Sequence, residues 1–161
     1  MTPTAFDAIF TEMGFSTKRA WLGGAVAYSV ARTYSLLIRE LERVYARFGL
    51  SAPSFNVLML LKHGEHPDVL TQQEISSHLV VSASDMSGLI DRLERKGFVQ
   101  RLPGRDRRSK LLHITSKGSQ LLDEIWPLHT ETLKRLTVVL SEHEAATLVQ
   151  ALARVRRAAE R

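Results

Sequence analysis

Apolar residues recur at helical spacing over most of this chain, and the pattern is clearest after residue 82. From Met86 onward, apolar side chains lie at i, i+3, i+4 and i+7, which places them on one face of a helix. This stripe comprises Met86, Leu89, Ile90 and Leu93. Ser82 and Asp85 have the spacing of a helix start, because a serine hydroxyl there can accept a hydrogen bond from a free backbone N–H. Gly97 is the expected end of the helix.

The opposite face of this helix carries small and cationic residues, which suit a close approach to another surface. They are Ser84, Ser87, Gly88, Asp91, Arg92 and Arg95. Upstream, Thr71 and Glu74 form a second capping pattern that opens a shorter helix, with Ile75 and Leu79 facing inward. Only a few residues separate the two helices. A short helix, a tight turn and a second helix with a small polar face are typical of a helix-turn-helix.

Two short strand candidates follow, at residues 98–102 and 110–114. The segment between them, residues 103–109, reads Pro-Gly-Arg-Asp-Arg-Arg-Ser and has the composition of a turn. A hairpin with glycine, proline and three arginines at its tip resembles a wing. The pattern therefore predicts a helix-turn-helix followed by a basic hairpin.

Positive charge is concentrated in this part of the chain. Residues 92–117 contain nine lysines and arginines against two acidic residues, a surplus of seven, whereas all 161 residues together have a net charge of +5. The rest of the chain is therefore slightly acidic. A localised cationic patch beside a helix-turn-helix is the pattern expected of a protein that binds the phosphate backbone of nucleic acid.

Residues 81–118 resemble the winged helix of the MarR family of bacterial transcription regulators. The order of the motifs carries the resemblance: LIDRLERKG at 89–97, a hydrophobic strand, the Asp-Arg-Arg loop at 106–108, and ITSKG at 114–118. The resemblance extends roughly over residues 21–158 and is strongest from 71 to 118. It implies a mainly α fold with a small β-hairpin wing, a winged helix-turn-helix whose terminal helices form a dimerisation domain.

Helical patterns also precede the winged helix. A short helix at 5–13 should end at Gly14 and pack on either a partner subunit or the first long helix. That long helix is expected at 17–48 and should stop at Gly49, although Gly23-Gly24 is a weak point near its start. Ser51 and Pro53 open the next helix. Its apolar residues, expected to be deeply buried, are Phe55, Val57, Leu58, Leu60 and Leu61.

After the wing, Thr115 is expected to cap a helix at 117–140, with a kink near 123–126 caused by Pro127. Ser141 and Glu144 open a last helix at 142–159. Its apolar stripe contains Leu148, Leu152 and Val155. Because the terminal helices lack a core of their own, we expect an obligate homodimer. We assign residues 1–50 and 116–161 to dimerisation and residues 51–115 to DNA binding.

The predicted contacts to DNA fall into two groups. The small residues of the second helix and Arg92 are expected in the major groove, the alternative being a solvated helix face. Thr71 and Gln72 are candidate phosphate anchors, the alternative being capping alone. The resemblance implies that Arg108 enters the minor groove and that Asp106 braces it. The full set is Thr71, Gln72, Ser82, Ser84, Ser87, Gly88, Arg92, Arg95, Arg105, Asp106, Arg107 and Arg108.

The resemblance also implies a small effector, often aromatic or anionic, bound where the dimer helices meet the winged helix. The candidate lining residues are Trp21, Tyr28, Arg32 and Trp126. Each has the alternative role of plain core or interface, because aromatic side chains dominate burial.

Other chemistry is not indicated. The absence of cysteine excludes disulfides and cysteine-ligated zinc, and it is compatible with a reducing cytoplasm, where we expect the protein to act. No apolar run approaches the roughly 20 residues of a membrane span, and residues 1–10 do not form a signal peptide. His63 and His66 lack a third ligand at a suitable spacing, so we expect no metal site. No catalytic constellation or phosphate loop is present, so neither an enzyme nor a cofactor is expected.

These patterns predict a DNA-binding protein that acts as a homodimer, and the resemblance implies a sequence-specific transcription regulator, a ligand-responsive repressor with a palindromic operator. The rival interpretation is a winged-helix module that binds proteins and has no sequence-specific DNA binding. The cationic surplus argues against the rival, and a binding test with a non-specific duplex separates the two.

Overall fold

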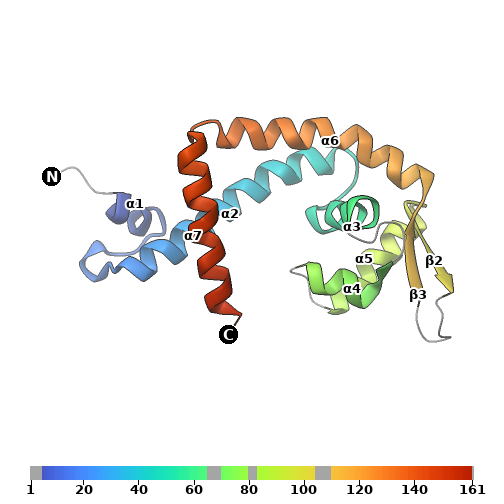
Figure 1. The fold of residues 1–161 in the computed structure, drawn as a ribbon, viewed down its shortest axis with the longest axis horizontal. Helices are drawn as coiled ribbons and strands as arrows, with labels where there is room; N and C mark the ends of the chain where they lie inside the picture. Colours follow the sequence, from blue (N-terminus) through green and yellow to red (C-terminus); the bar gives the residue numbers. More distant parts are fainter. Residues whose placement is uncertain (1–4, 65–69, 80–82, 104–109, 161) are drawn as a thin grey trace.

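The computed structural model describes residues 5–64, 70–79, 83–103 and 110–160, which form an elongated molecule (Figure 1). Its helices are α1 (Ala5–Glu12), a 3-10 turn η1 (Thr17–Arg19), α2 (Leu22–Ala46), α3 (Ala52–His63), α4 (Gln72–His78), α5 (Ala83–Arg95), α6 (Ser116–Thr137) and α7 (Glu142–Ala159). Its strands are β1 (Leu70–Thr71), β2 (Val99–Pro103) and β3 (Lys110–Ile114). The helix-turn-helix and hairpin lie at one end and α1 at the other, joined by α2 and α6 (Figure 1). The mainly α fold with a small wing is confirmed.

The winged-helix lobe has one hydrophobic core, formed by α3, α4, α5, the sheet and the adjoining turns of α2 and α6. All four residues of the predicted α5 stripe are buried, as are four of the five in α3. The prediction was wrong for Leu60, which is only partly buried. Because α3 is apolar nearly all round, periodicity could not tell which of its residues lie at the edge of the core.

The sheet has three antiparallel strands in the order β1-β3-β2, one strand more than the predicted hairpin. Leu70 of β1 pairs with Leu112 of β3. β1 is too short to show the alternation of apolar and polar residues from which a strand is predicted. β2 begins at Val99, one residue later than expected, and Val99 pairs with Ile114.

Several helix ends follow the predicted local chemistry. Thr71 accepts a hydrogen bond from the backbone N–H of Glu74 at 3.2 Å, and the Glu74 carboxylate accepts one from the Thr71 N–H at 2.7 Å. Ser141 and Glu144 form the same reciprocal capping box on α7. Gly97 has φ +72°, the left-handed conformation in which glycine ends helices. The proposed Ser82 cap lies outside the described residues.

The predicted start of the first long helix was wrong. Trp21 is extended, with φ −139° and ψ 154°, so α2 begins at Leu22. The indole folds back over the helix, where a Cβ on Gly24 would lie 2.8 Å from its ring carbons. Gly24 therefore leaves room for this ring. α1 was expected to pack on a partner subunit or on the first long helix. It packs on the long helix, because Ile9 and Phe10 are buried with Ala25 of α2.

The two C-terminal helices differ in how much of them is buried. α6 ends at Thr137, three residues before the expected position. It continues past Pro127, and its ribbon changes direction along its length (Figure 1). In α7 no residue is buried, and Leu148 and Val155 are each about half exposed. None of the described helices is long and apolar enough to cross a membrane.

Candidate nucleic-acid interface

A hydrogen bond links the two helices of the helix-turn-helix. The Gln72 side-chain amide donates to the Ser87 hydroxyl at 2.7 Å, so two of the predicted DNA-contacting groups bind each other. The Thr71 hydroxyl donates to the Glu74 carboxylate at 2.8 Å. Thr71 therefore caps α4, which is the alternative to the predicted phosphate contact.

The outer face of α5 is open to solvent where the structure describes its side chains. Ser87, Arg92 and Arg95 are exposed, and Gly88 is partly exposed between them. Ser84 lies in the first turn of α5. Arg95 donates to the Asp91 carbonyl at 3.4 Å, whereas Arg92 makes no side-chain hydrogen bond or ion pair within the described part of the chain. This face combines small residues with cations that can reach outward.

Arg101 has a different role from the one suggested by the charge count. Its guanidinium donates to Asp91 at 2.5 Å and to Glu94, so it joins β2 to α5. Although burial opposes its charge, the hydrogen bond to Asp91 and the charge of Glu94 raise the pKa of Arg101. Asp91 lies just before residues 92–117, so the net charge of that segment does not include one of the two carboxylates that bind Arg101.

Two further cations of the segment bind the protein's own backbone. Lys96 donates from Nζ to the Gly49 carbonyl at 2.6 Å. Lys117 donates to the Lys96 carbonyl at 2.8 Å and lies over the Phe98 ring, 5.1 Å from its centroid. The positive surplus is therefore divided between internal contacts and an outward-facing set.

β2 and β3 carry the chain toward the tip of the hairpin, where Pro103 pairs with Lys110 and both are exposed. The intervening residues lie outside the described part of the chain. The predicted roles of Arg105, Asp106, Arg107 and Arg108 therefore stay predictions.

The effector candidates fall into two clusters. Trp21 and Tyr28 belong to one, with ring centroids 6.2 Å apart, and Phe10 lies within 5.8 Å of both. Arg32, one turn beyond Tyr28 on α2, lies 3.7 Å from Glu12, and its buried Nε has no hydrogen-bond partner among the described residues.

Trp126 belongs to the second cluster. It stacks on His129 at 5.4 Å, and His129 Nδ1 shares a 2.8 Å hydrogen bond with the Tyr45 hydroxyl. Burial lowers the pKa of His129, and burial together with the charge of Glu42 raises the pKa of Tyr45. The ring contacts thus place Trp126 apart from Trp21 and Tyr28. Within the described residues, no group of three or more His, Asp or Glu is arranged to hold a metal ion.

Comparison with known proteins gives a consistent result. A model of the MarR family matches residues 48–109. The regulator PecS of Dickeya dadantii is 30% identical over 128 residues, which is 79% of this chain and 77% of PecS. MhqR of Bacillus subtilis is also 30% identical over 128 residues, covering 78% of this chain and 86% of MhqR. Both are HTH-type transcriptional regulators.

Solved structures agree with this assignment. A crystal structure of a MarR variant from E. coli with operator DNA has a TM-score of 0.74 at 26% identity, covering 81% of this chain and 92% of that one. AbsC of Streptomyces coelicolor shares the fold, with a TM-score of 0.78 at 22% identity over 87% of this chain and 97% of AbsC. The chain belongs to the MarR family of winged helix-turn-helix, DNA-binding transcription regulators, a class that is not enzymatic.

Proposed function

We propose that this protein is a homodimeric repressor that binds a palindromic operator and is released from it by a small effector. The observation that carries the proposal is the exposed face of α5, on which the small residues Ser87 and Gly88 are followed by Arg92 and Arg95, beside a hairpin whose sequence is basic. Residues 51–115 form the DNA-binding part in this proposal, and residues 1–50 and 116–161 the dimerisation part. Its place of action is the cytoplasm, since a repressor must reach the chromosome.

In this proposal, the second helix of the helix-turn-helix enters the major groove and the wing enters the neighbouring minor groove. The relative from E. coli with a similar fold was solved with operator DNA, which supports operator binding by this chain. Ser87 and Gly88 are small residues of α5, so the helix backbone can approach base edges closely there. The bond between Gln72 and Ser87 holds α4 and α5 in one orientation, which reduces the ordering cost of binding.

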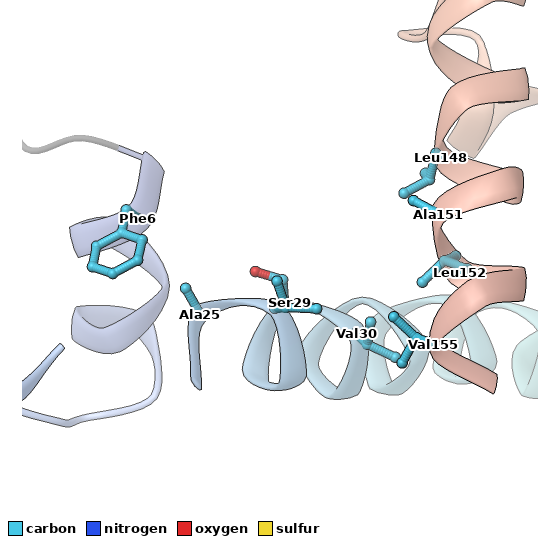
Figure 2. Close-up of a pocket in the computed structure, with 9 residues that line it drawn as sticks. Phe6, Ala25, Ser29, Val30, Leu148, Ala151, Leu152 and Val155 are labelled. Atoms are coloured by element: carbon cyan, nitrogen blue, oxygen red, sulfur yellow. The ribbon is translucent and has the colours of Figure 1, made fainter. Parts of the chain in front are cut away.

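An apolar groove supports the dimer. It is bordered by α1, α2 and α7, has a volume of about 400 Å³, and is lined by aliphatic and aromatic side chains with Ser29 as the polar exception. Figure 2 shows Leu148, Leu152 and Val155 of α7 on one side of the gap and Phe6 of α1 on the other. Val30 on α2 is 43% exposed.

The occupant of this groove, we infer, is a second copy of the chain. An apolar surface of this kind is rarely left open in a soluble protein, and α7 buries no residue of its own. Two-fold dimers are the commonest oligomers, and a helix-turn-helix dimer places its two reading helices about one duplex turn, roughly 34 Å, apart. Interlocking terminal helices would supply both the missing core and the two-fold axis.

Replacing Arg108 by Ala is expected to weaken operator binding by about 1–3 kcal/mol, because an arginine in a narrow minor groove meets an enhanced negative potential. The measurement is a gel shift at fixed salt, on an operator fragment selected from the source genome. Lys134→Ala, which removes an exposed cation from α6, is the control and should bind like the wild type. An unchanged affinity of Arg108→Ala would remove this residue from the mechanism.

The effector site is proposed beside Arg32, one helical turn beyond Tyr28, because its buried Nε makes no hydrogen bond to the described residues and has only a long ion pair of 3.7 Å to Glu12, for which a planar anion could compete. In a Trp126→Phe background, where Trp21 is the single tryptophan, benzoate-type carboxylates should change the tryptophan fluorescence. Arg32→Ala should weaken this binding about tenfold or more, since a hydrogen bond to a charged group is worth about 1.5–3 kcal/mol. Arg39→Ala on an exposed part of α2 is the matched control. Equal titrations of the two variants would contradict the assignment.

A further inference from the structure

The charges of α5 are separated onto two sides by Arg101. Asp91 and Glu94 both bind its guanidinium. Arg92 and Lys96 are four residues apart and therefore neighbours on the helix surface. Neither pairs with a carboxylate among the described residues. Arg101 thus holds both carboxylates on one side of α5, and the side bearing Arg92 and Lys96 stays positive.

These two cations border the same hollow. It lies between the start of α3 and the end of α5, has a volume of about 320 Å³, and is lined by Ser51 and Ser54 on one side and by Arg92 and Lys96 on the other. The Arg92 guanidinium extends back along the helix, because its Nη1 is 3.5 Å from where a Cβ on Gly88 would stand. Arg92 therefore borders the hollow and also reaches the face of α5 that bears Gly88 and is proposed to meet DNA.

The positive potential of this hollow comes from the side chains and not from the start of α3. The Ala52 N–H already donates to the Glu42 carboxylate at 2.7 Å, and the Ser51 hydroxyl accepts from the Ser54 N–H. Lys96 uses one of its three donors on the Gly49 carbonyl, which fixes its position and leaves two donors for another partner.

We propose that Arg92 and Lys96 together bind one backbone phosphate of duplex DNA at the edge of the major groove. Arg92 then positions the helix on the DNA backbone. The major-groove position predicted for it from the sequence would instead make it a base contact, for example to guanine. The inference rests on the proposed DNA docking and specifies which part of the DNA this end of α5 meets. Two cations four residues apart around a small hollow match a compact phosphodiester, whose two non-bridging oxygens share one negative charge, better than a flat base edge.

The two roles of Arg92 make opposite demands on a lysine substitution. A phosphate accepts a point charge, so Arg92→Lys should retain binding, whereas a guanine fork requires the planar guanidinium. Binding is measured by fluorescence anisotropy over a range of salt concentrations, on a mixed-sequence 30-bp duplex and on an operator fragment selected from the source genome. Lys134→Ala is the control for the loss of one cation.

If Arg92 and Lys96 contact a phosphate, Arg92→Ala and Lys96→Ala should each weaken binding to both duplexes by a similar factor, on the order of tenfold. Each should also lower the slope of log affinity against log salt concentration by about 1 per contact. Arg92→Lys and Lys134→Ala should behave like the wild type on both. Because Lys96 also holds Gly49, thermal melting of Lys96→Ala checks that the lobe is folded, and Arg92→Ala carries the conclusion if it is not.

Two results would overturn the inference. One is a loss of operator affinity in Arg92→Lys with unchanged binding of the mixed-sequence duplex, which would make Arg92 a base reader. The other is a wild-type salt slope in Arg92→Ala. Failure of the proposed function looks different: the wild type itself would then show no preference for any genomic fragment over the mixed-sequence duplex.

Discussion

Leu152→Asp is expected to convert the dimer to monomers and to abolish operator binding. Leu152 lies on the apolar stripe of α7, between the half-exposed Leu148 and Val155, and lines the groove that a second copy is proposed to fill. Placing an unpaired carboxylate in such an interface costs several kcal/mol, of the same order as the stability of many dimers. Light scattering at micromolar concentration measures the mass directly.

The matched control is Gln150→Asp. Gln150 is exposed and lies about half a turn from Leu152, on the other side of α7. It introduces the same charge into the same helix and should leave both the dimer mass and operator affinity unchanged. A wild-type chain that is monomeric at micromolar concentration, or a Leu152→Asp variant that stays dimeric, would show that this groove is not the interface.

Gly118→Ala is expected to destabilise the winged-helix lobe by about 3 kcal/mol, at the upper end of overpacking costs. A Cβ at this position would lie 2.2 Å from the Phe98 carbonyl oxygen and 3.1 Å from Ile114 Cγ1. That carbonyl cannot move freely, because it accepts the Thr115 N–H at 3.0 Å. The first turn of α6 would have to separate from the sheet that holds the wing. Urea denaturation gives the change in free energy of unfolding.

Gly88→Ala provides the comparison for this substitution. Gly88 is also helical, but a Cβ there would meet Arg92 Nη1 at 3.5 Å, an ordinary contact. Alanine should therefore stabilise α5 by about 0.5–1 kcal/mol, through the lower backbone entropy of the unfolded chain. If both variants lost stability equally, the close approach of α6 to Phe98 would not be the reason for glycine at position 118.

Much of the winged helix could be predicted from sequence because its signals are local. The capping boxes at Thr71 and Ser141 depend on residues three positions apart, and Gly97 ends α5 through its own backbone conformation. The α5 stripe depends only on helical spacing. The order of motifs along residues 81–118 then led to the family that the comparisons confirm.

The sequence by itself therefore determined the order of the helices and of the two hairpin strands, several helix ends, the buried face of α5 and the family. Only the tertiary structure decided that Arg101 holds Asp91 and Glu94, that Gln72 binds Ser87, and that the Trp21 indole packs over Gly24. The physical reason is range. Caps and stripes are set within one or two turns of a helix, whereas these contacts depend on which faces of separate elements meet once the core has closed.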